Sequence, residues 1–308
     1  MQSSDPKKYK KLLLVLLKAA ISGSLLYYVI SKTGLGKIAS TLGGINIGSF
    51  LVAVVLYLFA IYLSSIRWGL LMSDRPRKKQ LFSLYLIGSF FNIFLPGTIG
   101  GDAVKAYYLY KERGNSSAVI ASVFMDRYIG FAALAFIGIA AFPFGFSYFR
   151  GSFIEWILPL MVLSFISGSF IVFGLRLGQR IRFLSGLYEY FSLYMKKRTV
   201  LFKTFLLSLA VQTTGVLAVY TLSKGLNMQL PLLPLFIFIP VISAMTTIPI
   251  SISGLGVREA SFVLLFAYLG LSPSEATALS LSWFLSASTG SLAGLIEYIK
   301  YKNRLKSQ

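Results

Sequence analysis

Seven of the charged side chains in or beside the long apolar segments of this sequence are candidates for chemistry. They are Arg67, Asp102, Lys105, Asp126, Arg127, Arg258 and Glu259. A charged side chain at the centre of a membrane helix costs about 2.5–3.5 kcal/mol on insertion scales, and such residues are usually paired or functional. We therefore expect these side chains to form ion pairs, to bind a charged substrate, or to do both.

Asp102 and Lys105 follow a glycine-rich stretch that reads NIFLPGTIG. Three positions apart on a helix, the two side chains share a face and can pair, and Asp102 suits the positive end of a helix dipole. One interpretation is a helix cap with a local salt bridge. The other is a phosphate site that combines this lysine with exposed backbone N–H groups of Gly97, Gly100 and Gly101.

A second glycine-rich stretch, PISISGLGVRE, begins at Pro249 and ends with Arg258 and Glu259. Arg258 can hold a phosphate through two parallel hydrogen bonds, and Glu259 can neutralise this arginine or carry a proton. Asp126 and Arg127 are neighbours in another apolar segment. Because adjacent helical side chains point about 100° apart, we expect each of them to face a partner on a different helix.

Arg67 lies beside Trp68 near one end of a further apolar segment. In one interpretation it extends toward the lipid head groups, next to an interfacial tryptophan. In the other it belongs to a binding site whose cations hold phosphate and whose carboxylates balance charge, bind a cationic head group or carry protons. The expected substrate-binding residues are Arg258, Lys105, Arg67, Arg127, Asp102, Asp126 and Glu259.

The composition argues against several other kinds of chemistry. The 308 residues include no Cys and no His, which removes disulfides, thiol nucleophiles and the usual neutral-pH base, and disfavours zinc sites. We expect no catalytic residue, no metal and no cofactor. The net charge of +20 comes from basic residues that flank apolar runs, where such residues set topology and contact anionic lipid. No nucleic-acid motif accompanies this charge.

The elements that must position these residues are membrane helices. Hydrophobic residues make up 56% of the chain and charged residues 13%, whereas soluble domains have about 25% charged residues. A span needs about 20 apolar residues. We predict an all-α polytopic membrane protein with a single transmembrane domain over 1–308. Its six full spans are expected at 12–30, 50–72, 117–142, 155–175, 201–223 and 276–299.

Two further apolar stretches, 81–95 and 232–248, break before they can cross a membrane. A second helical piece follows each of them, at 102–112 and 257–270. Each pair is expected to form a re-entrant hairpin that enters and leaves on the same side. We expect non-helical backbone, buried in protein, at Pro96, Gly97, Gly100, Gly101, Pro249, Gly254 and Gly256.

The distribution of basic residues supports this topology. With the N-terminus inside, 20 of the 30 Lys and Arg residues fall in inner segments and 4 in outer segments, as the positive-inside rule requires. The halves, about 12–142 and 155–299, then repeat one order of elements in opposite orientations. Such repeats with paired broken helices are typical of secondary transporters that bind substrate at the midplane. We therefore expect Lys105 and Arg258 to line one cavity between the halves.

Four segments together resemble a known family. They are Arg67-Trp68, NIFLPGTIGGDAVK from Asn92 to Lys105, Asp126-Arg127, and PISISGLGVRE from Pro249 to Glu259. They are similar to the lysylphosphatidylglycerol synthetase transmembrane-region family, which also forms the flippase portion of the multiple peptide resistance factor. The resemblance spans nearly the whole chain and implies a bacterial or archaeal membrane protein that handles lipids. It does not imply lysyl transfer, because that reaction belongs to a soluble C-terminal domain which we do not expect here.

We therefore predict a flippase-like lipid translocator, or a lipid-handling transporter, in a cell membrane with both termini cytoplasmic. The expected partner is an anionic phospholipid or a polyprenyl-phosphate-linked lipid, whose tails stay in the bilayer. A homo-oligomer is an open possibility, and nucleic acid is not expected. One alternative is a membrane enzyme that transfers a group to or from a lipid-linked substrate, with Asp102 and Glu259 as its acid–base pair. Another is an accessory subunit of envelope assembly, in which the charges are structural.

Overall fold

Helices form the regular elements of the protein. The computed structural model describes residues 6–72, 76–95, 100–114, 116–152, 154–174, 191–248 and 250–306. Every element within these ranges is helical, which confirms the all-α prediction. The α-helices are α1 (Pro6–Thr33), α2 (Leu35–Gly43), α3 (Ile47–Leu70), α4 (Lys78–Phe94), α5 (Gly100–Arg113), α6 (Ser116–Gly145), α7 (Ile154–Ser169), α10 (Arg198–Gly225), α11 (Leu232–Thr247), α12 (Val257–Phe266), α13 (Pro273–Ser291) and α14 (Ala293–Lys306).

Local sequence sets where several of these helices begin. The Asn46 side chain accepts a hydrogen bond from the backbone N–H of Ser49 at 3.0 Å, so it caps α3 at its first turn. Ser272 and Glu275 form a capping box at the start of α13, with Pro273 at the first helical position, where its missing N–H costs nothing. These caps place the starts of two membrane helices at residues that prefer such positions.

Among the described residues, five helical stretches are long and apolar enough to cross a membrane. They are Ile47–Leu70, Ser117–Tyr148, Glu155–Gly174, Arg198–Gly225 and Pro273–Asn303, and they match five of the six predicted spans. The sixth prediction, 12–30, lies within α1, where the structure describes a shorter apolar stretch, Leu16–Ser31. Large side chains such as Val55 and Leu163 are more than half exposed, as expected where helices face lipid. The chain is therefore a multi-pass membrane protein.

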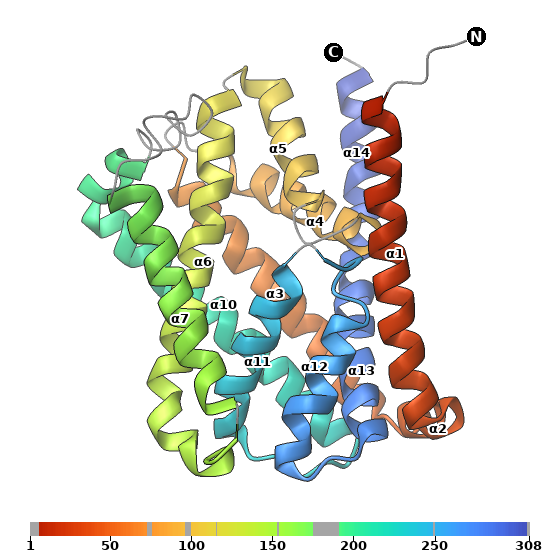
Figure 1. Cartoon of the computed structure of the whole chain (residues 1–308). Helices are drawn as coiled ribbons and strands as arrows, with labels where there is room; N and C mark the ends of the chain where they lie inside the picture. The colour runs from red at the N-terminus through yellow and green to blue at the C-terminus, as the bar shows by residue number, and fades with distance from the viewer. Residues whose placement is uncertain are drawn as a thin grey trace.

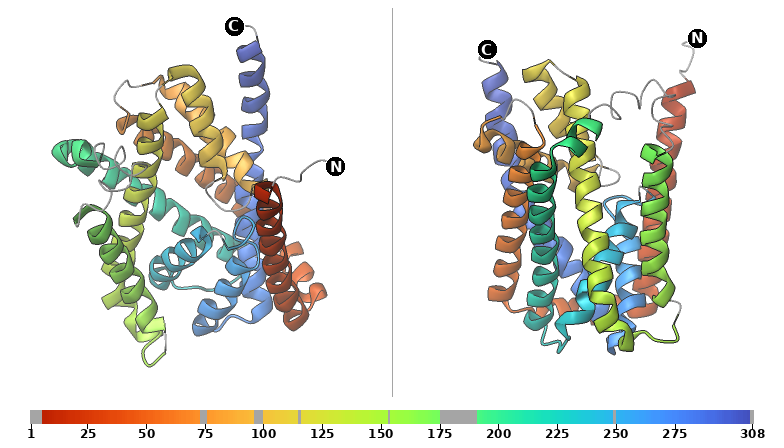
Figure 2. Two further views of the ribbon diagram at one scale, coloured as in Figure 1. Left: turned by 45° about the horizontal axis from the view of Figure 1, so that its top comes forward. Right: turned by 90° about the vertical axis from the view of Figure 1, so that its left-hand side faces the viewer.

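Two pairs of shorter helices correspond to the predicted hairpins. In Figure 1, α4 and α5 lie in the upper half of the bundle, at the end where α1 begins and α14 ends. The pair α11 and α12 lies in the lower half, and the right-hand view of Figure 2 shows the same arrangement. The two pairs thus approach the middle of the bundle from opposite ends. The relation of the two halves by an inverted repeat remains a prediction.

The turn of the second hairpin contacts the first hairpin near the C-terminal end of α4. Ser253 Oγ donates to the backbone oxygens of Asn92, at 2.6 Å, and of Ile93, at 3.0 Å, near the C-terminal end of α4. The backbone N–H of Ile252 donates to Ser22 Oγ on α1 at 2.9 Å. Buried backbone groups need hydrogen-bond partners, above all inside a membrane. These contacts supply them where the helical pattern is interrupted.

Candidate functional site

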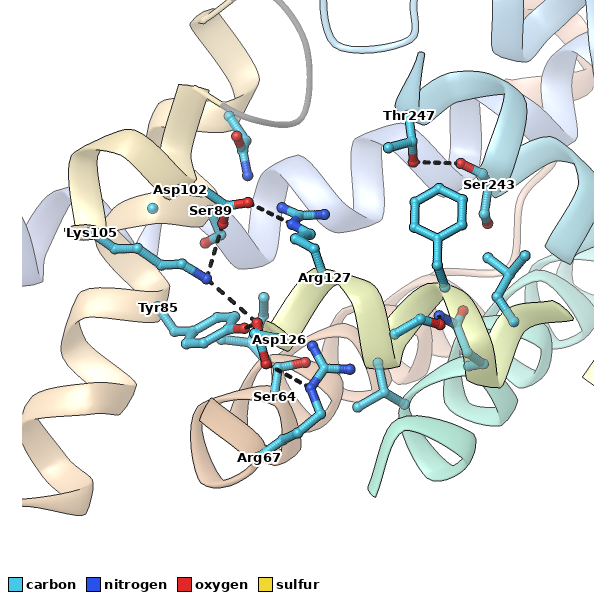
Figure 3. A pocket seen from close by; sticks show the side chains of 18 of the residues that line it. Ser64, Arg67, Tyr85, Ser89, Asp102, Lys105, Asp126, Arg127, Ser243 and Thr247 are labelled. Atoms are coloured by element: carbon cyan, nitrogen blue, oxygen red, sulfur yellow. Dashed lines mark hydrogen bonds and ion pairs between the residues drawn. The ribbon is translucent and has the colours of Figure 1, made fainter. Parts of the chain in front are cut away.

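A polar cavity of about 260 Å³ lies inside the bundle, and side chains of α3, α4, α5, α6, α10 and α11 line it (Figure 3). Its charged lining residues are Arg67, Asp102, Lys105, Asp126 and Arg127. Its uncharged polar lining residues are Tyr57, Ser64, Tyr85, Ser89, Asn92, Gln212, Ser243 and Thr247. The fold therefore brings five of the seven expected binding residues to one place, from the three helices α3, α5 and α6.

The charged residues form a chain in which cations and anions alternate. Arg67 Nε lies 2.7 Å from one oxygen of Asp126, and Lys105 Nζ lies 3.7 Å from its other oxygen. The same lysine nitrogen lies 2.9 Å from Asp102. Arg127 Nε lies 2.5 Å from the second oxygen of Asp102 and completes the chain. Asp126 and Arg127 do face partners on other helices, as their adjacency in the sequence predicted.

Polar and aromatic side chains hold this chain of charges in place. The Tyr85 hydroxyl donates to Asp126, and Arg67 Nη1 donates to Ser208 Oγ at 2.9 Å. Lys105 Nζ lies 3.9 Å from the ring centroid of Tyr85 and 4.9 Å from that of Trp68, within the range of cation–π attraction. Arg67 is only 6% exposed. It is therefore part of a buried network, and its interpretation as an interfacial arginine is wrong.

Arg127 differs from the other charged residues in its exposure. Its side chain is 40% exposed, whereas those of Lys105 and Asp126 are 2% and 1% exposed. Breaking a buried ion pair by removing one partner costs about 3–5 kcal/mol, because the other charge stays behind without compensation. The buried part of this chain of charges, around Lys105 and Asp126, is thus expected to be rigid. Arg127 is the most exposed cation of this charged chain.

The first glycine-rich break is more helical than the sequence indicated. Gly100 and Gly101 are the first residues of α5, so the expectation of non-helical backbone is wrong for both. A Cβ atom on Gly101 would lie 1.9 Å from the carbonyl oxygen of Gly88, so this glycine lets α5 approach α4. Its N–H already donates to Asn92 Oδ1 at 2.7 Å and is not free for a phosphate. Pro96 and Gly97 lie outside the described residues.

The second break keeps glycines in the conformation that only glycine adopts easily. Gly254 and Gly256 have φ angles of 77° and 82°, as expected for non-helical backbone. A Cβ atom on Gly256 would lie 2.9 Å from the carbonyl oxygen of Ser22 on α1, so a larger residue would also collide there. Pro249, the first residue of this motif, lies outside the described residues.

Arg258 and Glu259 do not line the cavity described above. Arg258 Nη2 lies 2.7 Å from Glu259 Oε1, and Arg258 Nε lies 3.2 Å from Ser280 Oγ. Glu259 also accepts a hydrogen bond from the N–H of Gly256 at 2.7 Å. The prediction that Lys105 and Arg258 share this cavity is wrong. The reason is that Glu259, which is fully buried, binds the guanidinium group next to it in the sequence.

Several lining residues were not predicted from the sequence. Tyr85 contacts the charged network, and Gln212 is part of the cavity wall. Ser243 and Thr247 lie across the cavity from Arg127. Hydroxyl residues are frequent in membrane helices, since they can bond to the helix backbone. Their presence alone therefore carries little information. A glutamine in the apolar segment 201–223 is the one signal that could have indicated this wall.

The fold and the site define a class: a multi-pass helical membrane protein with a buried ionic cavity between a broken-helix hairpin and the surrounding spans. The family described as lysylphosphatidylglycerol synthase TM region matches residues 15–294. The chain belongs to this family, which the sequence motifs predicted.

Two relatives are named UPF0104 membrane protein, both from Methanothermobacter thermautotrophicus (strain Delta H). One is 25% identical over 302 residues, covering 82% of this chain and 87% of the relative. The other is 25% identical over 313 residues, covering 89% of each chain. These similarities extend along most of the three sequences, so they concern the whole bundle.

Proposed function

We propose that this protein is a flippase-like lipid translocator whose cavity binds the anionic head group of a membrane lipid. The observation that carries the proposal is the charge of the cavity, which three cations and two carboxylates line. Each carboxylate already lies within 4 Å of two cations. A negatively charged ligand would therefore complete the balance of charge. Membership of the lysylphosphatidylglycerol synthase TM region family supports a role with lipids.

The size of the cavity suits a head group better than a complete lipid. Pockets for drug-sized ligands have volumes of about 300–1,000 Å³, and this cavity has about 260 Å³. The lipid tails would stay in the bilayer while the phosphate enters the bundle. Arg127 is the expected phosphate ligand, because its guanidinium group is the most exposed and offers a planar fork of donors. Lys105 and Arg67 would attract the anion from deeper in the cavity.

We further propose a cell-membrane location with the N- and C-terminal ends in the cytoplasm. The basic residues support this orientation, with 20 in predicted inner segments and 4 in outer ones. The start of α1 and the end of α14 lie at the same end of the bundle (Figure 1). Hairpins that approach from opposite ends would allow the cavity to open to each leaflet in turn.

The enzyme hypothesis needs an acid–base pair, for which Asp102 and Glu259 were the candidates. Asp102 lines the cavity and Glu259 does not, so these two residues do not form a pair in this cavity. The accessory-subunit hypothesis predicts that the charges only hold helices together, and the many ion pairs are compatible with it. A variant that removes a charge but leaves each buried carboxylate with a cation distinguishes transport from these two hypotheses.

Replacing Arg127 with Met is such a variant. Asp102 would keep its contact with Lys105 at 2.9 Å, so the inner network stays neutralised. Transport is measured in vesicles as the rate at which a fluorescent phosphatidylglycerol becomes accessible to a membrane-impermeant quencher. We expect at least a roughly tenfold slower rate per folded protein, since hydrogen bonds to charged groups contribute about 1.5–3 kcal/mol.

Lys203→Met is the matched control. Lys203 lies on α10, is exposed and does not line the cavity, so its loss should leave the rate unchanged. Equal rates for the two variants would contradict the proposed function. A reduced amount of folded Arg127→Met protein with an unchanged rate per molecule would instead support a structural role of the charges.

A further inference from the structure

The cavity has two ends of different chemistry. In Figure 3, the ion pairs of Asp102 and Asp126 lie at one end, and Ser243 and Thr247 lie at the other, with Arg127 between them. We call the first the ionic end. The second, which Gln212, Ser243 and Thr247 line from α10 and α11, is called the neutral end.

The neutral end has hydrogen-bonding capacity that the protein does not use. Gln212 Nε2 donates to the backbone oxygen of Gly130 at 3.3 Å, which leaves the carbonyl oxygen of its amide available. Thr247 Oγ1 donates to the backbone oxygen of Ser243 at 2.7 Å and keeps its acceptor lone pairs. Within the described part of the chain, the Ser243 hydroxyl has no hydrogen-bond partner. The neutral end therefore offers both donors and acceptors to a ligand.

We propose that the head group carries an uncharged, hydroxylated portion beyond its phosphate, such as glycerol or a sugar, and that the neutral end recognises this portion. The inference rests on the proposed function and specifies its substrate class as a polyol phosphate. With the phosphate at Arg127, the hydroxyl groups extend toward Ser243 and Gln212. Hydroxyl groups both donate and accept hydrogen bonds, which matches the mixed capacity of this wall.

Head groups that carry an amine match the cavity less well. Among the residues that the structure describes, no carboxylate lines the neutral end. An ammonium group there would be a charge without a partner, which is costly away from water. The carboxylates of Asp102 and Asp126 are each shared between two cations. Phosphatidic acid also matches the cavity less well, because its head group has no portion beyond the phosphate that could reach Ser243 or Gln212.

The test compares three lipids that share one labelled acyl chain. The full chain is placed in vesicles of phosphatidylcholine, and its transport rate is measured for phosphatidylglycerol, phosphatidylethanolamine and phosphatidic acid in turn. We expect phosphatidylglycerol to move about three- to tenfold faster than the other two, as one or two net hydrogen bonds would allow. Ser243→Ala and Gln212→Leu should lower its rate to that of phosphatidic acid and leave the phosphatidic acid rate unchanged.

Thr246→Ala is the matched control for Ser243→Ala. It removes a hydroxyl from the same helix that donates to the backbone oxygen of Ile242 at 3.0 Å and does not line the cavity. The selectivity of this variant should equal that of the native chain. Loss of selectivity in Thr246→Ala as large as in Ser243→Ala would overturn the assignment of the neutral end.

The outcomes separate this inference from the proposed function. Equal rates for phosphatidylglycerol and phosphatidic acid, or a faster rate for phosphatidylethanolamine, would overturn the polyol assignment while transport itself stands. Absence of transport for all three lipids would contradict the proposed function. Water-soluble glycerol phosphate serves as a competitor. If glycerol phosphate inhibited lipid transport at concentrations as low as those of the lipid, the result would support recognition of the polyol. It would contradict the proposal that the polyol phosphate is part of a lipid.

Discussion

The two glycine-rich breaks are similar in sequence but lead to different ionic arrangements. After the first break, Lys105 lies between Asp102 on its own helix and Asp126 on α6. After the second break, Arg258 binds Glu259, its neighbour in the sequence, at 2.7 Å. The first arrangement is a chain that continues from helix to helix and lines a cavity. The second is a closed cluster.

The spacing of the charges explains this difference. Asp102 and Lys105 are three positions apart and share one face of α5, so both reach toward α6. Glu259 instead turns back to accept the N–H of Gly256 at 2.7 Å, and Arg258 follows it. A glycine-rich break with an acid and a base can therefore build a binding site or secure its own backbone. In this protein we assign the first role to the first break and the second role to the second.

Removing Glu259 should have the largest effect on stability. Glu259→Ala leaves Arg258 buried without its carboxylate and frees the N–H of Gly256, and the loss of a buried partner costs about 3–5 kcal/mol. We expect a strongly lowered unfolding temperature of the purified protein in detergent, with little change in transport rate per folded molecule. Glu275→Ala, which removes a partly exposed capping carboxylate on α13, is the control and should have a smaller effect. Normal stability with no transport would show that Glu259 belongs to the binding site.

Gly101→Ala should have an intermediate effect, because it acts on packing and not on charge. Its Cβ would lie 1.9 Å from the backbone oxygen of Gly88, so α5 must move away from α4, at a cost of about 1–3 kcal/mol for overpacking. The movement shifts Asp102 and Lys105 and should slow transport as well. Gly215→Ala in α10, where a Cβ meets nothing within 4 Å, should be neutral or slightly stabilising. Unchanged transport in Gly101→Ala would argue against a precisely packed first hairpin.

Ser253→Ala should have the smallest effect, and it tests the contact between the two hairpins. It removes the hydrogen bonds to the backbone oxygens of Asn92 and Ile93, at a cost of about 0.5–1.5 kcal/mol. Ser253 has a φ of 52°, so Ser253→Gly loses the same bonds but relieves backbone strain. We expect the glycine variant to be the more stable of the two in thermal unfolding. The opposite order would mean that strain is not stored at this position.

Local signals in the sequence predicted the elements well. The apolar runs 81–95 and 232–248 lie in α4 and α11, whose ends at Phe94 and Thr247 precede the predicted breaks closely. Runs of apolar residues and glycine-rich motifs are properties of adjacent residues, so no tertiary information is needed. The prediction of non-helical backbone at Gly101 is wrong, because a glycine can indicate close packing of two helices as well as an unusual backbone conformation.

Side-chain partners were harder to predict than helices. Arg67 and Asp126 are 59 positions apart, and only the packing of α3 against α6 brings them together. No pattern of spacing encodes that contact. The cost of burying charge predicted that partners must exist, but not which ones. For the same reason the sequence could not show that Arg258 would bind its own neighbour and stay out of the cavity.

If the cavity binds an anion as we propose, the alternating chain of charges makes ligand binding a change of partner. An anion that binds Arg127 competes with Asp102, which keeps Lys105 as its remaining cation. Asp102 belongs to α5 and Arg127 to α6, so the competition weakens one of the bonds that join the hairpin to the span beside it. Binding of the ligand and weakening of the bond between the first hairpin and α6 then occur in the same exchange of ionic partners. Conversely, when the ligand leaves, re-formation of the Asp102–Arg127 pair draws the two helices together again.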